Sequence, residues 1–204
     1  VSHVKLAQEA CEIEIDILGK PIGIQDQIIA AHGNLCFVEF LKSGAVAVEK
    51  LPITPELKRN LTDNIMVFFT NRTRSANIIL QKQRSNIADR TEELIALRDL
   101  AYRAKDSVMN GNIDEIGVLL DENWQLKKRL ATGVSDEEID SMYTAAIEAG
   151  AIGGKIAGAG GGGFLVLYCP RINQDRVRNA LRGYREMPVG ISRDGTKIAF
   201  NINL

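Results

Sequence analysis

Two acidic side chains near the start of the chain could take part in phosphoryl transfer. Glu14 lies within "VKLAQEACEIEIDIL", on a stripe of three- and four-residue steps that otherwise carries apolar residues. Asp26 follows a glycine-broken loop and starts "DQIIAAHG". A carboxylate is costly to bury unless it is paired or binds a metal. One carboxylate that holds Mg²⁺ beside another that orients a hydroxyl is an arrangement for phosphoryl transfer. The simpler interpretation of Asp26 is a helix N-cap.

A glycine run, "GGKIAGAGGGGF" at residues 153–164, holds seven of the chain's 18 glycines. Linkers are usually Gly/Ser-rich and polar-flanked, whereas this run has no serine and precedes an apolar stretch. It contains G-x-G-x-x-G, but the expected order of helix, loop, strand is the reverse of the dinucleotide-binding motif, and no G-K-[ST] follows. Consecutive glycines can direct N–H groups toward a phosphate. A tight turn between closely packed backbones explains the run equally well.

Basic residues form the third candidate group. Arg72 and Arg74, in "TNRTRSAN", lie between an expected buried strand and a helix that Ser75 would cap. Guanidinium groups beside a helix N-terminus suit a phosphate, although two solvated loop arginines would give the same pattern. Trp124 has the helical spacing of a core residue. His32 and Cys36 are four residues apart, but two lone ligands favour packing over a metal site.

The composition narrows the class of protein. The 204 residues are 45% hydrophobic and 25% charged, as in ordinary globular domains. A net charge of −1 gives no field that would attract nucleic acid or an anionic membrane. No apolar run reaches transmembrane length, and the first residues lack a signal-peptide layout. The three cysteines are scattered, without a C-x-x-C pair, which fits a reducing cytoplasm. We therefore expect a cytoplasmic protein without nucleic-acid or membrane partners.

The pattern along the chain predicts an α+β fold with a mostly antiparallel sheet, because strands and helices mix without strict alternation. The main ambiguity is "IEIDI", which fits either the end of the first helix or a strand. Two prolines near residues 52–60 mark the best domain boundary. The expected helices are 4–18, 26–33 (capped by Asp26 and ended by Gly33), 75–109, 112–130, 136–149 (with a Ser135–Glu138 capping box) and 173–184; the expected strands are 35–40 and 46–51 (a hairpin), 64–70, 164–169 and 196–204.

In this order the segments resemble the GHMP small-molecule kinases, which include galactokinase, homoserine, mevalonate and phosphomevalonate kinases. "KIAGAGGGGF" is similar to the third motif of that family, "GKPIGIQDQ" to the segment with its catalytic aspartate, and "IEIDILG" to the stretch before it. The longer segments "GIQDQIIAAHGNLCFVEF", "FFTNRTRSANIIL", "NWQLKKRL" and "EAGAIGGKIAGAGGGGFLVLYCP" resemble the bacterial D-glycero-D-manno-heptose 7-phosphate kinases within it. The resemblance covers essentially the whole chain.

The resemblance implies the end of a ribosomal-S5-like N-terminal domain at residues 1–55. A ferredoxin-like GHMP kinase C-terminal domain with inserted helices would follow at residues 56–204. It also implies transfer of the ATP γ-phosphoryl group to the anomeric hydroxyl of a sugar phosphate. Asp26 would be the catalytic residue and Glu14 would bind Mg²⁺. The residues of the glycine motif would support the phosphate and substrate region: Gly158, Ala159, Gly160, Gly161 and Gly162.

Two further expectations concern the binding of phosphate groups. From their charge and placement, we expect Arg72, Arg74 and Lys155 to bind the substrate's own phosphate. The family's main ATP loop, a PxxxGLGSS-like stretch that opens a helix, is not found in these residues. The chain therefore resembles the C-terminal two-thirds of a GHMP kinase. Because such a loop supplies much of the binding in phosphoryl transfer, we expect little kinase activity from these residues alone.

Two other interpretations stay open. The chain could be a catalytically silent remnant of a GHMP kinase that acts as a binding or dimerisation module. An unrelated ferredoxin-like regulatory domain would explain the order of elements but would leave Asp26 and Glu14 unexplained. The oligomeric state is open, with a homodimer as one candidate.

Overall fold

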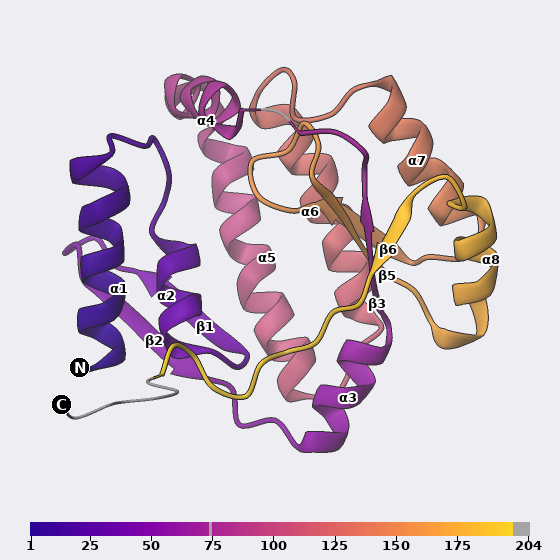
Figure 1. Ribbon diagram of the computed structural model, residues 1–204, viewed down its shortest axis with the longest axis horizontal. Helices are drawn as coiled ribbons and strands as arrows, with labels where there is room; N and C mark the ends of the chain where they lie inside the picture. Colours follow the sequence, from indigo (N-terminus) through magenta and orange to yellow (C-terminus); the bar gives the residue numbers. More distant parts are fainter. Residues whose placement is uncertain (74, 198–204) are drawn as a thin grey trace, which may run out of the picture. The chain divides into compact units, whose positions relative to one another are not determined.

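The computed structural model describes residues 1–73 and 75–197 (Figure 1). They form two compact units: Val1–Pro52 together with the segment that begins at Gly190, and Ile53–Val189. Each unit has its own antiparallel sheet and its own cluster of buried apolar side chains. Across the described ranges, no helix combines the length and the apolar character needed to cross a bilayer.

The first unit begins with α1 (His3–Cys11), which the Ser2 hydroxyl caps by accepting the N–H of Lys5. The chain continues without a break into η1 (Glu12–Ile17), a π-helix. The prediction of a helix here is confirmed, and the alternative strand over "IEIDI" is wrong. In η1 the N–H of Leu18 donates to the carbonyl of Ile13, five residues back, at 3.0 Å. Such wide turns are rare and frequently occur at functional sites.

The second helix of this unit, α2 (Gln25–His32), ends at Gly33, as predicted. Gly33 has φ +63°, a backbone angle that favours glycine at the end of a helix. The prediction that Asp26 is the N-cap is wrong. The N-cap position is Ile24, which makes no side-chain capping bond. Because the N-cap lies two residues earlier than expected, Asp26 lies within the first turn, where a negative charge is favourable to the helix dipole.

A hairpin completes the first unit, as predicted. Strands β1 (Cys36–Phe40) and β2 (Val46–Lys50) pair antiparallel with Val38 opposite Val48. The segment after Gly190 returns to α2, where the N–H of Thr196 donates to the carbonyl of Ala30 at 2.9 Å. Most of the predicted strand 196–204 lies outside the described residues.

The second unit is built on a four-stranded antiparallel sheet of order β4-β5-β3-β6. Its strands are β3 (Ile65–Phe69), β4 (Gly153–Ile156), β5 (Phe164–Tyr168) and β6 (Arg185–Met187). The central pair, β3 and β5, was predicted, whereas β4 and β6 were not. Phe68 lies opposite Leu165 in the register, so these side chains share one face of the sheet. The α+β class with antiparallel pairing is confirmed.

The helices of the second unit depart from the prediction at two points. The boundary segment forms α3 (Pro55–Asp63), which Thr54 caps. The single helix expected over 75–109 is two helices, α4 (Ala76–Ser85) and α5 (Thr91–Met109), with a 3-10 turn, η2 (Ala88–Arg90), between them. The Asn86 side-chain amide donates to the carbonyl of Leu130 at 3.0 Å, a long-range bond that stabilises the break.

The remaining helices, α6 (Glu115–Leu130), α7 (Glu137–Glu148) and α8 (Gln174–Ala180), were predicted with somewhat different ends. The prediction that Ser135 and Glu138 form a capping box for α7 is wrong. Its cap is Asp136, which accepts the N–H of Ile139 at 3.2 Å, while Ser135 donates to Asp140. The carboxylate of Asp136 also pairs with a neighbouring arginine, as described below.

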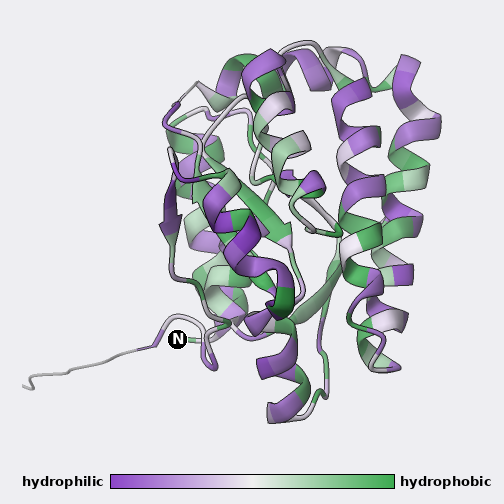
Figure 2. Ribbon diagram, turned by 90° about the vertical axis from the view of Figure 1, so that its right-hand side faces the viewer, coloured by the Kyte–Doolittle hydropathy of each residue, from purple (hydrophilic) through white to green (hydrophobic). Residues whose placement is uncertain are grey.

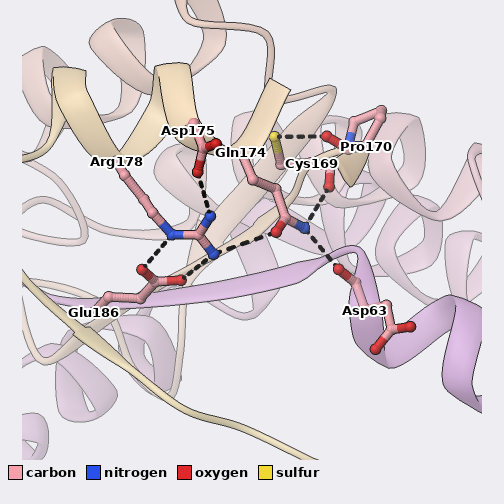
Figure 3. A network of polar contacts seen from close by, with 7 residues as sticks. All are labelled: Asp63, Cys169, Pro170, Gln174, Asp175, Arg178 and Glu186. Atoms are coloured by element: carbon pink, nitrogen blue, oxygen red, sulfur yellow. Dashed lines mark hydrogen bonds and ion pairs between the residues drawn. The ribbon is translucent and has the colours of Figure 1, made fainter. Parts of the chain in front are cut away.

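Packing in the second unit follows from its amphipathic helices. Figure 1 shows α7 and α8 on one side of the sheet and α5 and α6 on the other. Trp124 of α6 has no exposed surface, which confirms its predicted place in the core. In Figure 2 most helices carry both hydrophilic and hydrophobic residues. Arg178 of α8 pairs with Glu186 of β6 at 2.8 Å, so an ion pair also joins these two elements (Figure 3).

Candidate functional site

Glu14 is held in place by two donors within the first unit. Its Oε2 accepts from Lys20 Nζ at 3.2 Å, and its Oε1 accepts from Gln27 Nε2 at 3.3 Å. These two bonds, that from Lys20 first, lower the pKa of Glu14, so the carboxylate is ionised at neutral pH. Its side chain is 36% exposed. The expectation of a paired carboxylate is met, although the pairing occurs at the surface and not in the core.

Asp26 lies beside Glu14. Both residues line a depression of about 500 Å³ whose walls are formed by α1, η1, α2 and Thr196. Asp26 is exposed, and its carboxylate has no hydrogen-bond or ion-pair partner among residues 1–73 and 75–197. The two carboxylates that the sequence singled out therefore share one surface, and one of them is unpaired.

The carboxylate of Glu14 fits a magnesium ion of the kind used with phosphates. Mg²⁺ is usually bound through one or two carboxylates together with substrate phosphates, so a single ionised glutamate suffices on the protein side. Oε2 already accepts from a cation, the ammonium group of Lys20 at 3.2 Å, and a bound Mg²⁺ would replace that group at this oxygen. No group of three or more His, Cys, Asp and Glu side chains with metal-binding geometry occurs in the described part of the chain.

The glycine loop, residues 157–163 of the second unit, is fastened to several neighbouring segments. The N–H of Gly161 donates to the carbonyl of Val134 at 2.8 Å, and that of Gly163 to the carbonyl of Arg72 at 2.9 Å. Gln83 of α4 donates to the carbonyl of Ala159 at 3.3 Å. These bonds favour the interpretation of the run as a tight turn between closely packed backbones.

The same loop retains donors that it does not use itself. The N–H groups of Gly158, Ala159 and Gly162 have no acceptor within the portion of the chain that the structure describes. Gly160, at φ +101°, lies so near Val134 that an added Cβ would be 2.7 Å from its carbonyl oxygen. The loop therefore needs glycine for its own packing, and its free N–H groups leave a role beside phosphate open.

Arg72 is bound by two acidic residues at the start of α7. Its Nη1 donates to Asp136 at 2.8 Å and lies 3.1 Å from Glu138. Its guanidinium is 25% exposed. The ion pairs fix Arg72 next to the glycine loop, and its role as a phosphate ligand stays a prediction. Arg74 lies outside the described residues.

Lys155 of β4 is accompanied by a second lysine. Lys127 of α6 donates from Nζ to the carbonyl of Gly158 in the glycine loop. Burial lowers the pKa of Lys127 to about 8, and the charge of Lys155 contributes to the shift. Burial also lowers the pKa of Lys155. Two partly buried ammonium groups thus lie beside the loop.

Two residues were not predicted from the sequence: Gln27, which bonds to Glu14, and Lys127, which bonds to the glycine loop. Gln27 is the residue after Asp26, and no spacing rule distinguished it. Lys127 had a detectable signal, because it follows Trp124 by three residues and precedes Ala131 by four, on a helix face that is otherwise buried. A charged residue on an apolar face is the same signal that identified Glu14.

Comparison with protein families gives one match: the model described as GHMP kinases C terminal fits residues 71–186. Among curated proteins, the chain is 31% identical over 184 residues to D-glycero-alpha-D-manno-heptose 7-phosphate kinase from Campylobacter jejuni, covering 89% of this chain and 54% of that protein. It is 29% identical to the mevalonate kinase of Pyrococcus furiosus, covering 97% of this chain and 58% of that protein. The chain spans little more than half the length of these relatives.

Solved structures share the fold. A D-glycero-D-manno-heptose 1-phosphate kinase from Bacteroides thetaiotaomicron superposes with a TM-score of 0.72 at 24% identity, over 98% of this chain and 57% of that one. Lactococcus lactis galactokinase, complexed with galactose, gives a TM-score of 0.70 at 21% identity, over 97% of this chain and 62% of that one. At these identities the likeness concerns the fold alone.

Proposed function

This chain belongs to the GHMP kinase family, and from that premise we propose that it serves the transfer of the ATP γ-phosphoryl group to the anomeric hydroxyl of a heptose 7-phosphate. The observation that carries the proposal is the shared depression of Glu14 and Asp26. A carboxylate that holds Mg²⁺ and a second that accepts the proton of the attacking hydroxyl are parts that kinases use for phosphoryl transfer. The choice of sugar follows the printed activity of the Campylobacter jejuni relative.

Asp26 acts on the sugar in this proposal. Its carboxylate is exposed and unpaired in the described part of the chain, so it is free to accept a hydrogen bond from the attacking hydroxyl. It orients that hydroxyl toward the γ-phosphorus and takes its proton as the new P–O bond forms, while the bond from the γ-phosphorus to the β,γ-bridging oxygen breaks and ADP leaves. The first turn of α2 holds Asp26 at the edge of the depression.

Glu14 acts on the phosphates. Its bonds to Lys20 and Gln27 keep it ionised and limit its rotation. Mg²⁺, when bound, neutralises charge that develops on the transferred group. In this proposal Glu14 is the protein ligand of that ion.

The second unit supplies the groups that bind phosphate oxygens. Gly158, Ala159 and Gly162 offer N–H groups that have no acceptor among the described residues, and Lys155 offers an ammonium group. Arg72 and Arg74 are proposed to bind the phosphate already present on the sugar. Arg72 would give up its ion pair with Glu138, the more exposed of its two acidic partners, and bind the phosphate instead.

The test is an assay of product. The 204 residues, and the same residues with any coding sequence that precedes Val1 in frame, are incubated with Mg-ATP and D-glycero-D-manno-heptose 7-phosphate. Phosphorus NMR of the longer protein should show a second phosphate at the anomeric position. Asp26→Asn should abolish turnover and leave ATP binding intact, with Asp16→Asn as the matched control. Normal turnover by Asp26→Asn would refute the assigned role, and phosphorylation of another sugar alone would refute the substrate.

A further inference from the structure

Helix α6 and strand β4 run side by side in the same direction. At one end an added Cβ on Gly153 of β4 would be 2.0 Å from the carbonyl oxygen of Gly117 and 3.0 Å from Asp121, so the two backbones touch. At the other end Lys127 of α6 reaches the carbonyl of Gly158, just after β4. The interval between these two contacts contains Lys155.

The pleat of β4 turns Lys155 toward the same helix. Side chains two residues apart in a strand project from the same face. Since the Cβ direction of Gly153 meets α6, the side chain of Lys155 projects toward α6 as well. Lys127 follows Asp121 by less than two helical turns, its ammonium group reaches the carbonyl of Gly158, and the charge of Lys155 acts on it. The two ammonium groups therefore enter one space at the glycine loop.

Neither lysine has an acidic partner within residues 1–73 and 75–197. Asp121, the acidic residue of α6 that lies against Gly153, is already engaged, since it accepts the hydroxyl of Tyr143 at 2.6 Å and the amide of Gln125 at 2.9 Å. The neighbouring Lys128 pairs with Asp140 at 3.3 Å. Partly buried cations without counter-ions are unfavourable unless a ligand supplies the negative charge.

We propose that Lys127 and Lys155, with the free N–H groups of the glycine loop, form a binding site for the doubly charged phosphate group of a small-molecule ligand. Lys127 has three N–H donors, of which one is held by Gly158 and two remain for phosphate oxygens. The loop carbonyl fixes the direction of the ammonium group. Lys127 is thus a phosphate-binding residue that the family resemblance did not indicate.

The phosphate has two candidate sources, the 7-phosphate of the sugar and the phosphates of ATP. Assignment to either ligand rests on the proposed function, whereas the site itself does not. The two lysines suit any terminal phosphate. An ammonium group acts as a point charge, whereas the planar guanidinium of arginine binds phosphate in a fixed bidentate geometry. Binding experiments can separate the two sources.

The experiment measures binding, without turnover, to the 204-residue chain. Inorganic phosphate, heptose 7-phosphate, the unphosphorylated heptose and ATP are titrated separately by calorimetry. Lys127→Met and Lys155→Met should each weaken binding of the phosphate-bearing ligand by about tenfold or more. Arg129→Met, which removes an exposed charge from the same helix, should change it less than about twofold. Lys127→Arg should keep most of the binding.

The outcomes distinguish the proposals. Binding of heptose 7-phosphate but not of heptose assigns the site to the sugar phosphate, and selective binding of ATP assigns it to the nucleotide. Absence of binding by every phosphate ligand, or equal affinity of Lys127→Met and Arg129→Met, would overturn the inference. Circular dichroism confirms that each variant is folded. If the longer protein turns over but these variants bind normally, the site is wrong and the kinase proposal stands.

Discussion

The side-chain amide of Gln27 donates from Nε2 to Oε1 of Glu14 at 3.3 Å and thereby joins α2 to the π-helix η1. A carboxylate can only accept, so this contact determines which way the amide points. Gln27 is 7% exposed, and its own carbonyl oxygen Oε1 is buried without a partner in the described residues. The residue after the proposed catalytic aspartate therefore acts as a positioning residue for Glu14.

Gln27→Met should separate this positioning role from stability. The change removes one hydrogen bond but also an unsatisfied buried oxygen, so the free energy of unfolding should change by less than about 1 kcal/mol in urea titrations. Glu14 loses a donor, and its pKa should rise. The magnesium concentration at half-maximal activity should increase several-fold, with kcat less affected. An unchanged magnesium dependence would rule out the positioning role.

The pH dependence of stability should reveal Lys127. Its pKa of about 8 is below the ordinary lysine value of 10.5. Between these values the unfolded chain holds a proton that the folded chain lacks, so this group's contribution to stability increases as pH rises from 8 to 10.5. Below pH 8 the charged, partly buried side chain is fully destabilising. Lys155 is the only other charged residue of the described chain that contributes to this shift.

Lys127→Met should therefore stabilise the ligand-free chain at pH 7, by between about 1 and 3 kcal/mol. It should also flatten the rise in stability above pH 8, as urea unfolding at several pH values would show. Arg129→Met should leave both quantities within about 0.5 kcal/mol of the parent. A destabilised Lys127→Met would mean that the lysine contributes packing and not an unpaired charge.

Two glycines of the same loop allow a matched test of its packing. Gly160 and Gly163 both have left-handed backbone angles, φ +101° and +89°. An added Cβ on Gly160 would be 2.7 Å from the carbonyl oxygen of Val134, whereas on Gly163 nothing lies within 4 Å. Gly163→Ala should cost about 1 kcal/mol of backbone strain. Gly160→Ala should cost at least about 1 kcal/mol more, and equal melting temperatures would argue against a packed loop.

Glu138 offers a test of the predicted role of Arg72. Its carboxylate, 57% exposed, lies 3.1 Å from Nη1 of the guanidinium. Glu138→Gln should release part of the guanidinium at a stability cost of no more than about 1 kcal/mol. If Arg72 binds the sugar's phosphate, the KM for the sugar phosphate should fall in this variant. A rise in KM, or no change, would assign Arg72 to holding α7 alone.

The sequence predicted those helices and strands whose ends are determined by residues close to them in the chain. The helix ended by Gly33 and the hairpin around Gly44 depend on neighbouring residues, and both are present. The break after Ser85 could not be predicted, because it involves a bond from Asn86 to Leu130, 44 residues away. The strand "GGKI" has too little β-propensity to be recognised, and it forms because β5 pairs with it along its whole length.

The same distinction applies to the candidate site. The charge of Glu14 on an apolar stripe was visible, but its partners Lys20 and Gln27 depend on how η1 and α2 meet. Asp26 was found for its position and given the wrong local role, since the N-cap lies two residues before the position that the capping pattern suggests. The pairing of Lys127 with Lys155 requires α6 to lie along β4, and no spacing in the chain encodes that contact.

The contact between Gly153 and Gly117 has a consequence for protein engineering. Any side chain at position 153 would meet the carbonyl of Gly117 and push α6 away from β4. Lys127 and Lys155 would then move apart although neither had been altered. The spacing between the two charges therefore depends on a residue that has no side chain, and even Gly153→Ala should weaken phosphate binding although both lysines are kept.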